Sequence, residues 1–189
     1  MKAYLPKFFA FNHANDLVRI GKDYDGGYLV SKSDIEKSDV LIGLGISDDW
    51  SFEEDFLSLK NIEVYAYDAS VSKGFFLKQI FRSIIRLDKL KTFSYWLKKF
   101  WNYKKFFSQN NVNHIQKFVG LNSESDMYCT FSEVLNEKKH KNIFLKIDVE
   151  SSEYRFLDDI LDYQDRITGM VIELHDCDIH LQKIRRFIN

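Results

Sequence analysis

The sequence predicts an α/β protein built on a doubly wound, mostly parallel sheet with flanking helices. Short uninterrupted apolar runs, which are typical of buried parallel strands, alternate with segments of helical periodicity. Three of these runs end in residues that suit a ligand: VLIGLGIS in Gly43 and Gly45, NIEVYAYDAS in Asp68, and NIFLKIDVE in Asp148. Because ligands of open α/β sheets bind beyond the carboxyl ends of the strands, we expect a Rossmann-like fold with a site at these ends.

Composition narrows the class of protein. The 189 residues fit a single domain, 1–189, and the net charge of −1 gives no argument for nucleic acid as a partner. Cys129 and Cys177 stand outside any CxxC or CxxH spacing, which disfavours a disulfide framework or a structural zinc site. No run approaches the ~20 apolar residues of a transmembrane segment, and the N-terminus lacks a signal-peptide core, so we expect a cytoplasmic protein.

The N-terminal half supplies a hairpin region and the first two strands of the sheet. Residues 1–38 contain LVRIGKDYDGGYLV, where Asp25-Gly26-Gly27 supplies the positive-φ positions of a tight turn between two short strands. The apolar runs predict strands at 40–46 and 63–67. Between them, the S-x-x-E spacing that starts at Ser51 is a capping box and predicts the start of a helix.

A helical insertion, 71–113, separates the second predicted strand from the third. It contains one acid, Asp88, against ten cations, and eleven aromatic residues are interleaved with them. The cations are Lys73, Lys78, Arg82, Arg86, Lys89, Lys91, Lys98, Lys99, Lys104 and Lys105. The pattern predicts two amphipathic helices, with two interpretations open. In the first, the aromatic residues pack on the core while the lysines stay solvated. In the second, the insertion is a lid that recruits an anionic substrate, a glycan polymer or a membrane surface. No motif supports base stacking on nucleic acid.

The C-terminal half alternates strands with helices. The predicted strands are 115–120, 143–149 and 170–174, and the predicted helices are TFSEVLNEKK, 152–161 and 178–188. In the first of these helices Phe131, Val134 and Leu135 form the apolar face. Only thirteen residues follow Asp176, so the strand 170–174 would be an exposed edge of the sheet. We expect either an apparently truncated C-terminus or a homodimer that covers the edge, unless the strand count is in error.

The turn Gly43-Leu44-Gly45-Ile46-Ser47 discriminates between cofactors. A dinucleotide fingerprint needs a third glycine, where this chain has Ser47, and Asp48 and Asp49 follow where a pyrophosphate would lie. Two negative charges disfavour NAD but are compatible with S-adenosylmethionine (SAM), which carries a sulfonium, an ammonium and no phosphate. Asp68 follows Gly45 at the spacing expected of an acid that accepts hydrogen bonds from ribose hydroxyls.

The segments LIGLGISDDWSFEEDF, VYAYDAS, TFSEVL, LKIDVESSEY and VIELHD follow one another in this order. In that order they resemble the FkbM-type methyltransferases, which are class I SAM-dependent enzymes that mostly methylate hydroxyls of sugars and natural products. RIGKDYDGGYLV is similar to the subgroup in which a DGGY hairpin precedes the glycine motif. The resemblance covers Arg19 to His175 without the insertion, and implies a Rossmann-like sheet. The chain departs from the family at Ser47, which replaces the third glycine, and at Ser151, where the family usually has glycine.

The resemblance also implies roles for individual residues. Gly43 and Gly45 would line the methionine part of SAM, and Asp68 would hold its ribose. Asp148 would bind the cofactor at the methyl-transfer site, and the DGGY hairpin adds Asp25 to the cofactor-binding residues.

Methyl transfer to a hydroxyl requires alignment of the reacting atoms and a group that takes the proton. Asp148, Glu173 and His175 are the catalytic candidates, because the ends of the strands 143–149 and 170–174 are adjacent in this topology. We favour His175 as the proton acceptor, since an imidazole titrates near neutral pH. The same three residues could instead hold a divalent metal ion that acidifies the substrate hydroxyl.

Simpler explanations stay open for several of these residues. His175 could be an ordinary surface histidine, and Glu150 and Glu153 could be acids that favour the dipole of a helix in its first turn. The other histidines lie in no motif and are expected to face solvent: His13, His114, His140 and His180.

The sequence thus leads to a SAM-dependent O-methyltransferase that acts on a sugar hydroxyl of a small molecule or glycan, in surface-glycan or natural-product synthesis. The alternative is a catalytically inactive or truncated Rossmann-like interaction module. A nicotinamide-dependent oxidoreductase is disfavoured by the glycine turn. A nucleic-acid amino-methyltransferase is disfavoured because the strand 143–149 leads into DVES rather than a (D/N)PP(Y/F) motif.

Overall fold

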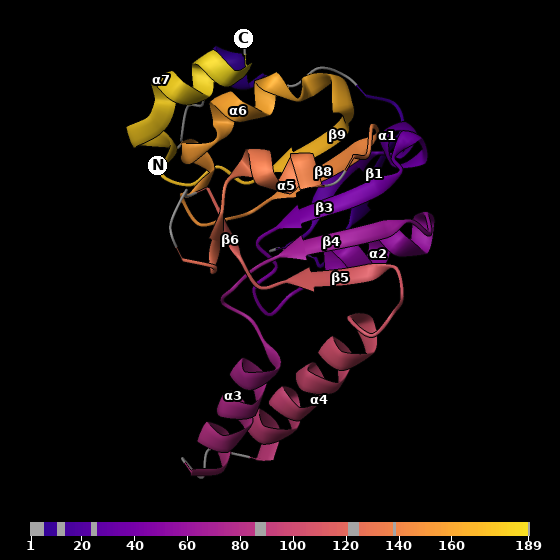
Figure 1. The fold of residues 1–189 in the computed structure, drawn as a ribbon, viewed down its shortest axis with the longest axis vertical. Helices are drawn as coiled ribbons and strands as arrows, with labels where there is room; N and C mark the ends of the chain where they lie inside the picture. Colours follow the sequence, from indigo (N-terminus) through magenta and orange to yellow (C-terminus); the bar gives the residue numbers. More distant parts are fainter. Residues whose placement is uncertain are drawn as a thin grey trace.

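The computed structural model describes residues 6–10, 14–23, 26–85, 90–120, 125–137 and 139–188, and it confirms the α/β class. A five-stranded parallel sheet in the order β5-β4-β3-β8-β9 forms the centre of the molecule (Figure 1). Its strands are β3 (Val40–Leu44), β4 (Glu63–Tyr67), β5 (Val112–Ile115), β8 (Ile143–Ile147) and β9 (Ile167–Ile172). The carboxyl ends of all five strands therefore lie along one edge, as the sequence predicted.

The central strands contribute to two separate cores because successive side chains point to opposite faces. Val40 and Leu44 of β3 belong to the core on one face, whereas Leu41 belongs to the core on the other. In β8, Leu145 faces the first core and Phe144 the second. Both faces are buried, which explains why these strands appear in the sequence as unbroken apolar runs.

Helices cover both faces of this doubly wound sheet. The first core includes side chains of α5 (Phe131–Glu137), α6 (Leu157–Asp162) and α7 (Cys177–Ile188). The second includes side chains of α1 (Lys32–Lys37) and α2 (Ser51–Leu59). Short 3-10 turns occur at η1 (Lys7–Phe9), η2 (Glu153–Arg155) and η3 (Gln164–Arg166). The predicted helix 152–161 is thus divided into η2 and α6.

The helix starts show which capping signal the fold uses. Thr130 and Glu133 form a true capping box before α5, with the backbone nitrogen of each residue donating to the side chain of the other at 2.7 and 3.1 Å. The predicted start of α2 at Ser51 is confirmed, but the prediction that Ser51 and Glu54 form a capping box is wrong. Ser51 Oγ accepts a hydrogen bond from the backbone of Lys22 instead, at 3.1 Å, and so ties α2 to the N-terminal hairpin.

Two strands of the sheet begin and end at other residues than predicted. The third strand of the sheet is Val112–Ile115 rather than 115–120, because the chain turns after Ile115, where the nitrogen of Lys117 donates to its carbonyl. The remaining apolar residues form β6 (Phe118–Val119), which pairs with β7 (Tyr128–Cys129) in a separate two-stranded sheet. The last strand, β9, is Ile167–Ile172 and so begins before the predicted 170–174.

β9 is the last strand of the sheet and, within the described residues, pairs only with β8, as the sequence predicted for its last strand. The N-terminal hairpin of β1 (Leu17–Ile20) and β2 (Tyr28–Ser31) leads into α1, and both β2 and α1 contact β9. Gly169 permits this contact, because a Cβ there would lie 2.8 Å from Cβ of Asp34 in α1. The N-terminal region therefore packs on the face of β9 that belongs to the second core, which includes Val30, Ile35 and Val171.

The insertion forms the two predicted amphipathic helices, α3 (Lys73–Ile85) and α4 (Leu90–Phe106). Figure 1 shows this hairpin extending away from the sheet on the side of β5. Phe76, Tyr103 and Phe106 are buried and anchor the base of the hairpin against Trp50 and the second core. None of the helices in the described ranges combines the length and apolar character needed to cross a bilayer.

Candidate functional site

A cavity of about 440 Å³ lies at the carboxyl ends of β3, β4 and β8, where the sequence predicted a ligand. Its volume falls within the range of about 300–1,000 Å³ that is usual for small-molecule sites. The described residues that line it are Gly45, Ile46, Ser47, Tyr67, Asp68, Ser70, Lys117, Phe118, Val119, Tyr128, Asp148, Val149, Glu150, Ser152 and Arg155. The cavity thus combines the glycine turn, both predicted acids and an aromatic pair.

Gly45 allows β3 and β8 to approach each other at the floor of the cavity. Its φ is +80°, and a Cβ there would lie 1.7 Å from the carbonyl oxygen of Asp148, so no other residue fits. Gly43 has a different role from the one predicted, since it is not among the described residues that line the cavity. A Cβ at Gly43 would lie 2.7 Å from Oε1 of Glu53, behind the turn.

A buried ion pair supports the glycine turn from behind. Lys146 Nζ donates to the carbonyl oxygen of Gly45 at 2.6 Å and lies 3.8 Å from Oε1 of Glu53, which is 0% exposed. Burial raises the pKa of Glu53, and the charge of Lys146 opposes that shift. Sequence reasoning missed both residues. The available signal was a lysine inside the otherwise apolar strand FLKI and an acid after Phe52 on the buried face of α2.

Asp68 shapes the turn with both of its carboxylate oxygens. Oδ2 accepts hydrogen bonds from the backbone nitrogens of Ile46 and Ser47 at 3.0 and 2.7 Å. Oδ1 accepts from the nitrogen and the hydroxyl of Ser70 at 2.7 and 2.6 Å. Asp68 lies in the cavity as predicted, but a ribose would have to share or replace the contact with the Ser70 hydroxyl.

Asp48 and Asp49 lie outside the cavity, which removes the charge argument against a pyrophosphate. Lys22 Nζ is 2.7 Å from Oδ2 of Asp49, and Lys99 Nζ donates to the carbonyl oxygen of Asp48. Neither aspartate is among the described residues that line the cavity. The sequence interpretation failed here because the chain turns directly after Ser47, whose φ is +46°.

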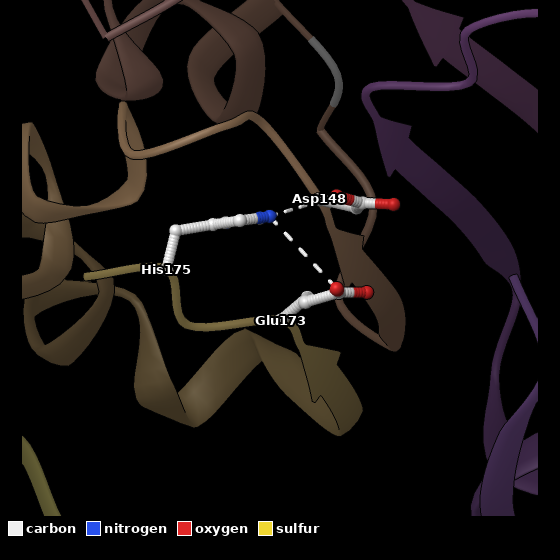
Figure 2. Close-up of side chains that lie close together, drawn as sticks. All are labelled: Asp148, Glu173 and His175. Carbon is white, nitrogen blue, oxygen red and sulfur yellow. Dashed lines mark ion pairs between the residues drawn. The ribbon is translucent and has the colours of Figure 1, made fainter. Parts of the chain in front are cut away.

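An acid–histidine cluster adjoins the cavity through Asp148. Nε2 of His175 lies 3.9 Å from Oδ1 of Asp148 and 3.8 Å from Oε1 of Glu173. Figure 2 shows the imidazole pointing toward both carboxylates, which come from the ends of β8 and β9. Glu150, which lines the cavity, lies 3.6 Å from the same nitrogen through Oε2. The structure therefore brings together all three predicted catalytic residues.

Two further residues hold the cluster, and sequence reasoning assigned neither a role in it. Glu153 is 0% exposed, and its Oε1 accepts from the backbone nitrogen of His175 at 2.7 Å and lies 3.3 Å from Nδ1. Tyr28 donates its hydroxyl proton to Oε2 of Glu173 at 2.8 Å and lies 3.3 Å from Oδ2 of Asp148. Tyr28 belongs to the DGGY motif, which was the signal available. The motif's Asp25 lies outside the described residues.

The charges of the cluster shift its protonation equilibria. Burial raises the pKa of Asp148, and the neighbouring Glu173 adds to this shift against Lys146. Partial burial lowers the pKa of His175, but the surrounding carboxylates, led by Glu153, outweigh it and the net shift is upward. Burial and the bond to Glu173 raise the pKa of Tyr28, which therefore stays a hydrogen-bond donor.

Two other histidines do not face solvent as expected. His114 accepts the hydroxyl proton of Tyr103 at Nδ1 (2.6 Å) and donates from Nε2 to the carbonyl oxygen of Asp68 (2.9 Å). Burial lowers the pKa of His114. His180 stacks on Tyr154, with ring centroids 3.8 Å apart. His140 is partly exposed and lies 3.3 Å from Glu63, and His13 lies outside the described residues.

The cluster meets the geometric requirements of a divalent cation. One oxygen each of Asp148 and Glu173 and one nitrogen of His175 all lie within 4.8 Å of one another. Such separations suit atoms arranged around an ion whose bonds to oxygen or nitrogen are about 2.0–2.5 Å long. The contact from Glu153 to Nδ1 also resembles the carboxylate support that metal-bound histidines usually have.

Comparisons with protein-family models, with curated proteins and with solved structures returned no match to this chain. The fold and the geometry of the site are therefore the basis for any assignment of function.

Proposed function

We propose that this chain is a SAM-dependent O-methyltransferase that acts on a hydroxyl group, with a sugar as the expected acceptor. The observation that carries the proposal is that the cavity and the acid–histidine cluster adjoin each other. A cavity formed by a glycine turn and a strand-end acid shares Asp148 with a cluster containing a histidine. The sugar as acceptor rests on the resemblance to FkbM-type enzymes alone.

The cofactor would occupy the cavity beside Gly45, which is among the residues that line it. SAM supplies an electrophilic methyl group on a sulfonium. Phe118 and Tyr128, whose ring centroids are 5.7 Å apart, both line the cavity and would hold the adenine. Asp68 would accept a ribose hydroxyl in place of Ser70, and Arg155 would pair with the amino-acid carboxylate.

The acceptor hydroxyl would lie between the cavity and His175. In its neutral form with the proton on Nδ1, the imidazole has a free lone pair on Nε2. This nitrogen would take the hydroxyl proton as the methyl group passes from the sulfur of SAM to the oxygen, which leaves S-adenosylhomocysteine. Glu153 would hold the Nδ1 proton and stabilise the resulting imidazolium. Tyr28 would keep Glu173 in place through its hydrogen bond.

Alternatively, a divalent cation would activate the acceptor hydroxyl. The short separations between the ligand atoms of the cluster support this second route. Asp148, Glu173 and His175 would hold the ion, which would lower the pKa of a bound hydroxyl. Glu153 would then orient the histidine as a ligand rather than stabilise an imidazolium.

Methyl transfer from labelled SAM to a panel of monosaccharides and polysaccharides tests the proposal. The variant His175→Gln should lose about 10²–10⁴-fold in rate while it still binds SAM, and His140→Gln, outside the cavity, should match the native chain. Transfer that is equally fast in His175→Gln would refute the assigned role of this histidine.

Metal dependence distinguishes proton transfer to His175 from activation of the hydroxyl by a cation. Titration of Mn²⁺ into the chain without SAM should show one site that is lost in Glu173→Gln if the cation route holds, and a chelator should then abolish transfer. Transfer that is unaffected by the chelator, with no Mn²⁺ binding, would leave His175 as the proton acceptor.

A further inference from the structure

The α3–α4 hairpin carries large apolar side chains on its exposed surface. Four lie on α3 and four on α4, and each is between 37% and 89% exposed. They are Leu77, Phe81, Ile84, Ile85, Leu90, Tyr95, Leu97 and Trp101. Single exposed apolar residues are ordinary on protein surfaces, but eight on two adjacent helices mark an interaction surface.

The apolar residues are arranged in helical stripes. Leu77, Phe81 and Ile85 follow one another at intervals of four residues, and so share a face of α3. Leu90, Leu97 and Trp101 occur at intervals of seven and four and share a face of α4. The buried anchors Phe76 and Tyr103 lie at other positions, so the exposed stripes are not part of the core.

Four of these residues lie at the end of the hairpin that is farthest from the sheet. Phe81, Ile84 and Ile85 occupy the last turns of α3, and Leu90, at 89% exposed, begins α4. Figure 1 shows this end of the hairpin projecting away from the rest of the molecule. An extended planar partner could reach these residues without contacting the body of the protein.

The charge of the two helices is strongly positive. Three cations lie in α3 and five in α4, and neither helix contains an acid. They are Lys73, Lys78, Arg82, Lys91, Lys98, Lys99, Lys104 and Lys105. Lys78 and Arg82 directly follow Leu77 and Phe81 in the sequence, so cations border the apolar stripe of α3. This combination of apolar and basic residues is typical of helices that lie in the interface of an anionic bilayer.

We infer that the α3–α4 hairpin is a docking surface for an anionic phospholipid membrane. Five of the eight exposed side chains are aliphatic and give no stacking surface for nucleic acid bases, which disfavours a polynucleotide. A second copy of the chain would bring a second set of cations, among them Lys78 and Arg82, against this face, which disfavours self-association through it. A bilayer accommodates the apolar side chains and attracts the cations at once.

Docking would tether the candidate site to the membrane through the hairpin. Lys99 of α4 donates to the carbonyl oxygen of Asp48, which follows the glycine turn directly, and Tyr95 Oη lies 3.4 Å from Oδ2 of the same residue. The base of the hairpin is thereby fixed to the turn that lines the cavity. Membrane docking does not depend on the proposed methyltransferase activity, because it is measured without SAM or acceptor.

Co-sedimentation of the full chain with vesicles tests the inference. Vesicles of phosphatidylcholine with phosphatidylglycerol should bind the native chain at low salt, and vesicles of phosphatidylcholine alone should bind it far more weakly. The variant with Lys78→Gln and Arg82→Gln should lose about five-fold in affinity for each cation removed. The variant with Phe81→Ser and Ile85→Ser should lose about ten-fold for each side chain.

Matched controls lie on the body of the protein. Lys32→Gln with Lys37→Gln removes two exposed cations of α1, and Ile179→Ser removes an apolar side chain of α7 that is 74% exposed. Both should bind the anionic vesicles as the native chain does, and circular dichroism should show the same fold in all variants. Failure of the native chain to bind, or equal losses in the controls, would overturn the inference. Binding of single-stranded DNA or self-association that depends on Phe81 and Ile85, without vesicle binding, would replace the membrane with that partner.

Discussion

At the residue scale, the site is built around backbone conformations that a side chain disfavours. Ser47, Glu150 and Ser151 follow the ends of β3 and β8, and all three have positive φ, between +46° and +70°. Two of these, Ser47 and Ser151, are the positions at which the resemblance to FkbM-type enzymes leads one to expect glycine. Serine in this left-handed conformation carries strain that glycine would not carry.

Replacing Ser47 by glycine should relieve part of this strain. The backbone nitrogen of Ser47 keeps its hydrogen bond to Asp68 in the variant, so only the left-handed conformation changes in free energy. We expect Ser47→Gly to raise the free energy of unfolding by up to about 1 kcal/mol in urea denaturation, after the larger chain entropy of glycine is subtracted. Ser47→Ala, which keeps the strain, should be close to neutral. A loss of stability in Ser47→Gly would show that the turn is not strained.

His114 should make stability depend on pH. Burial lowers its pKa in the folded chain, whereas the unfolded chain has the ordinary value of about 6.5. The unfolded state therefore binds more protons below that pH, and the free energy of unfolding should fall as the pH decreases from about 6.5, by no more than about 1.4 kcal/mol for each pH unit.

The contribution of His114 can be separated from that of the carboxylates. In urea denaturation between about pH 5 and 7, where most carboxylates stay ionised, His114→Gln should be less stable than the native chain at neutral pH and should show a smaller pH slope. An unchanged slope in the variant would mean that another group titrates in this window.

At the scale of elements, the sequence predicted most strands and helices because burial on both faces leaves unbroken apolar runs. The strands β3 and β8, which are buried along their whole length, confirm this, whereas the helix α5 was predicted from the helical spacing of Phe131, Val134 and Leu135. The predicted strand 115–120 had the wrong bounds because the apolar residues around Ile115 belong to two different sheets. The chain turns between them at Lys117, and no glycine or proline marks this turn in the sequence. The role of Tyr28 could not be predicted either, since it depends on how the N-terminal hairpin packs against β9.

The capping box of α5 gives a test at this scale. Thr130→Ala removes the hydroxyl that accepts from the nitrogen of Glu133, and should lower the free energy of unfolding by about 1 kcal/mol. Thr130→Ser retains the hydroxyl and should recover most of the loss. Thermal or urea denaturation of the three chains measures both effects, and equal stability of Thr130→Ala and the native chain would contradict the capping role.

At the scale of the whole molecule, one edge of the sheet gathers the chemistry that the sequence distributes along the chain. The residues around the cavity come from β3, β4 and β8, from the small β6–β7 sheet and from the loop after β8. The N-terminal hairpin supplies Tyr28 to the cluster, and the insertion holds the turn through Lys99. Binding of SAM in this cavity is the claim on which the proposed activity depends.

Calorimetric titration of SAM and S-adenosylhomocysteine into the chain tests that claim most directly. We predict binding of both to the native chain and a loss of at least about ten-fold in affinity when Phe118 and Tyr128 are both replaced by alanine. Phe81→Ala, which removes an exposed aromatic residue outside the cavity, should bind as the native chain does. Absence of SAM binding by the folded native chain, or binding of NADH in its place with the same dependence on Phe118 and Tyr128, would contradict the account.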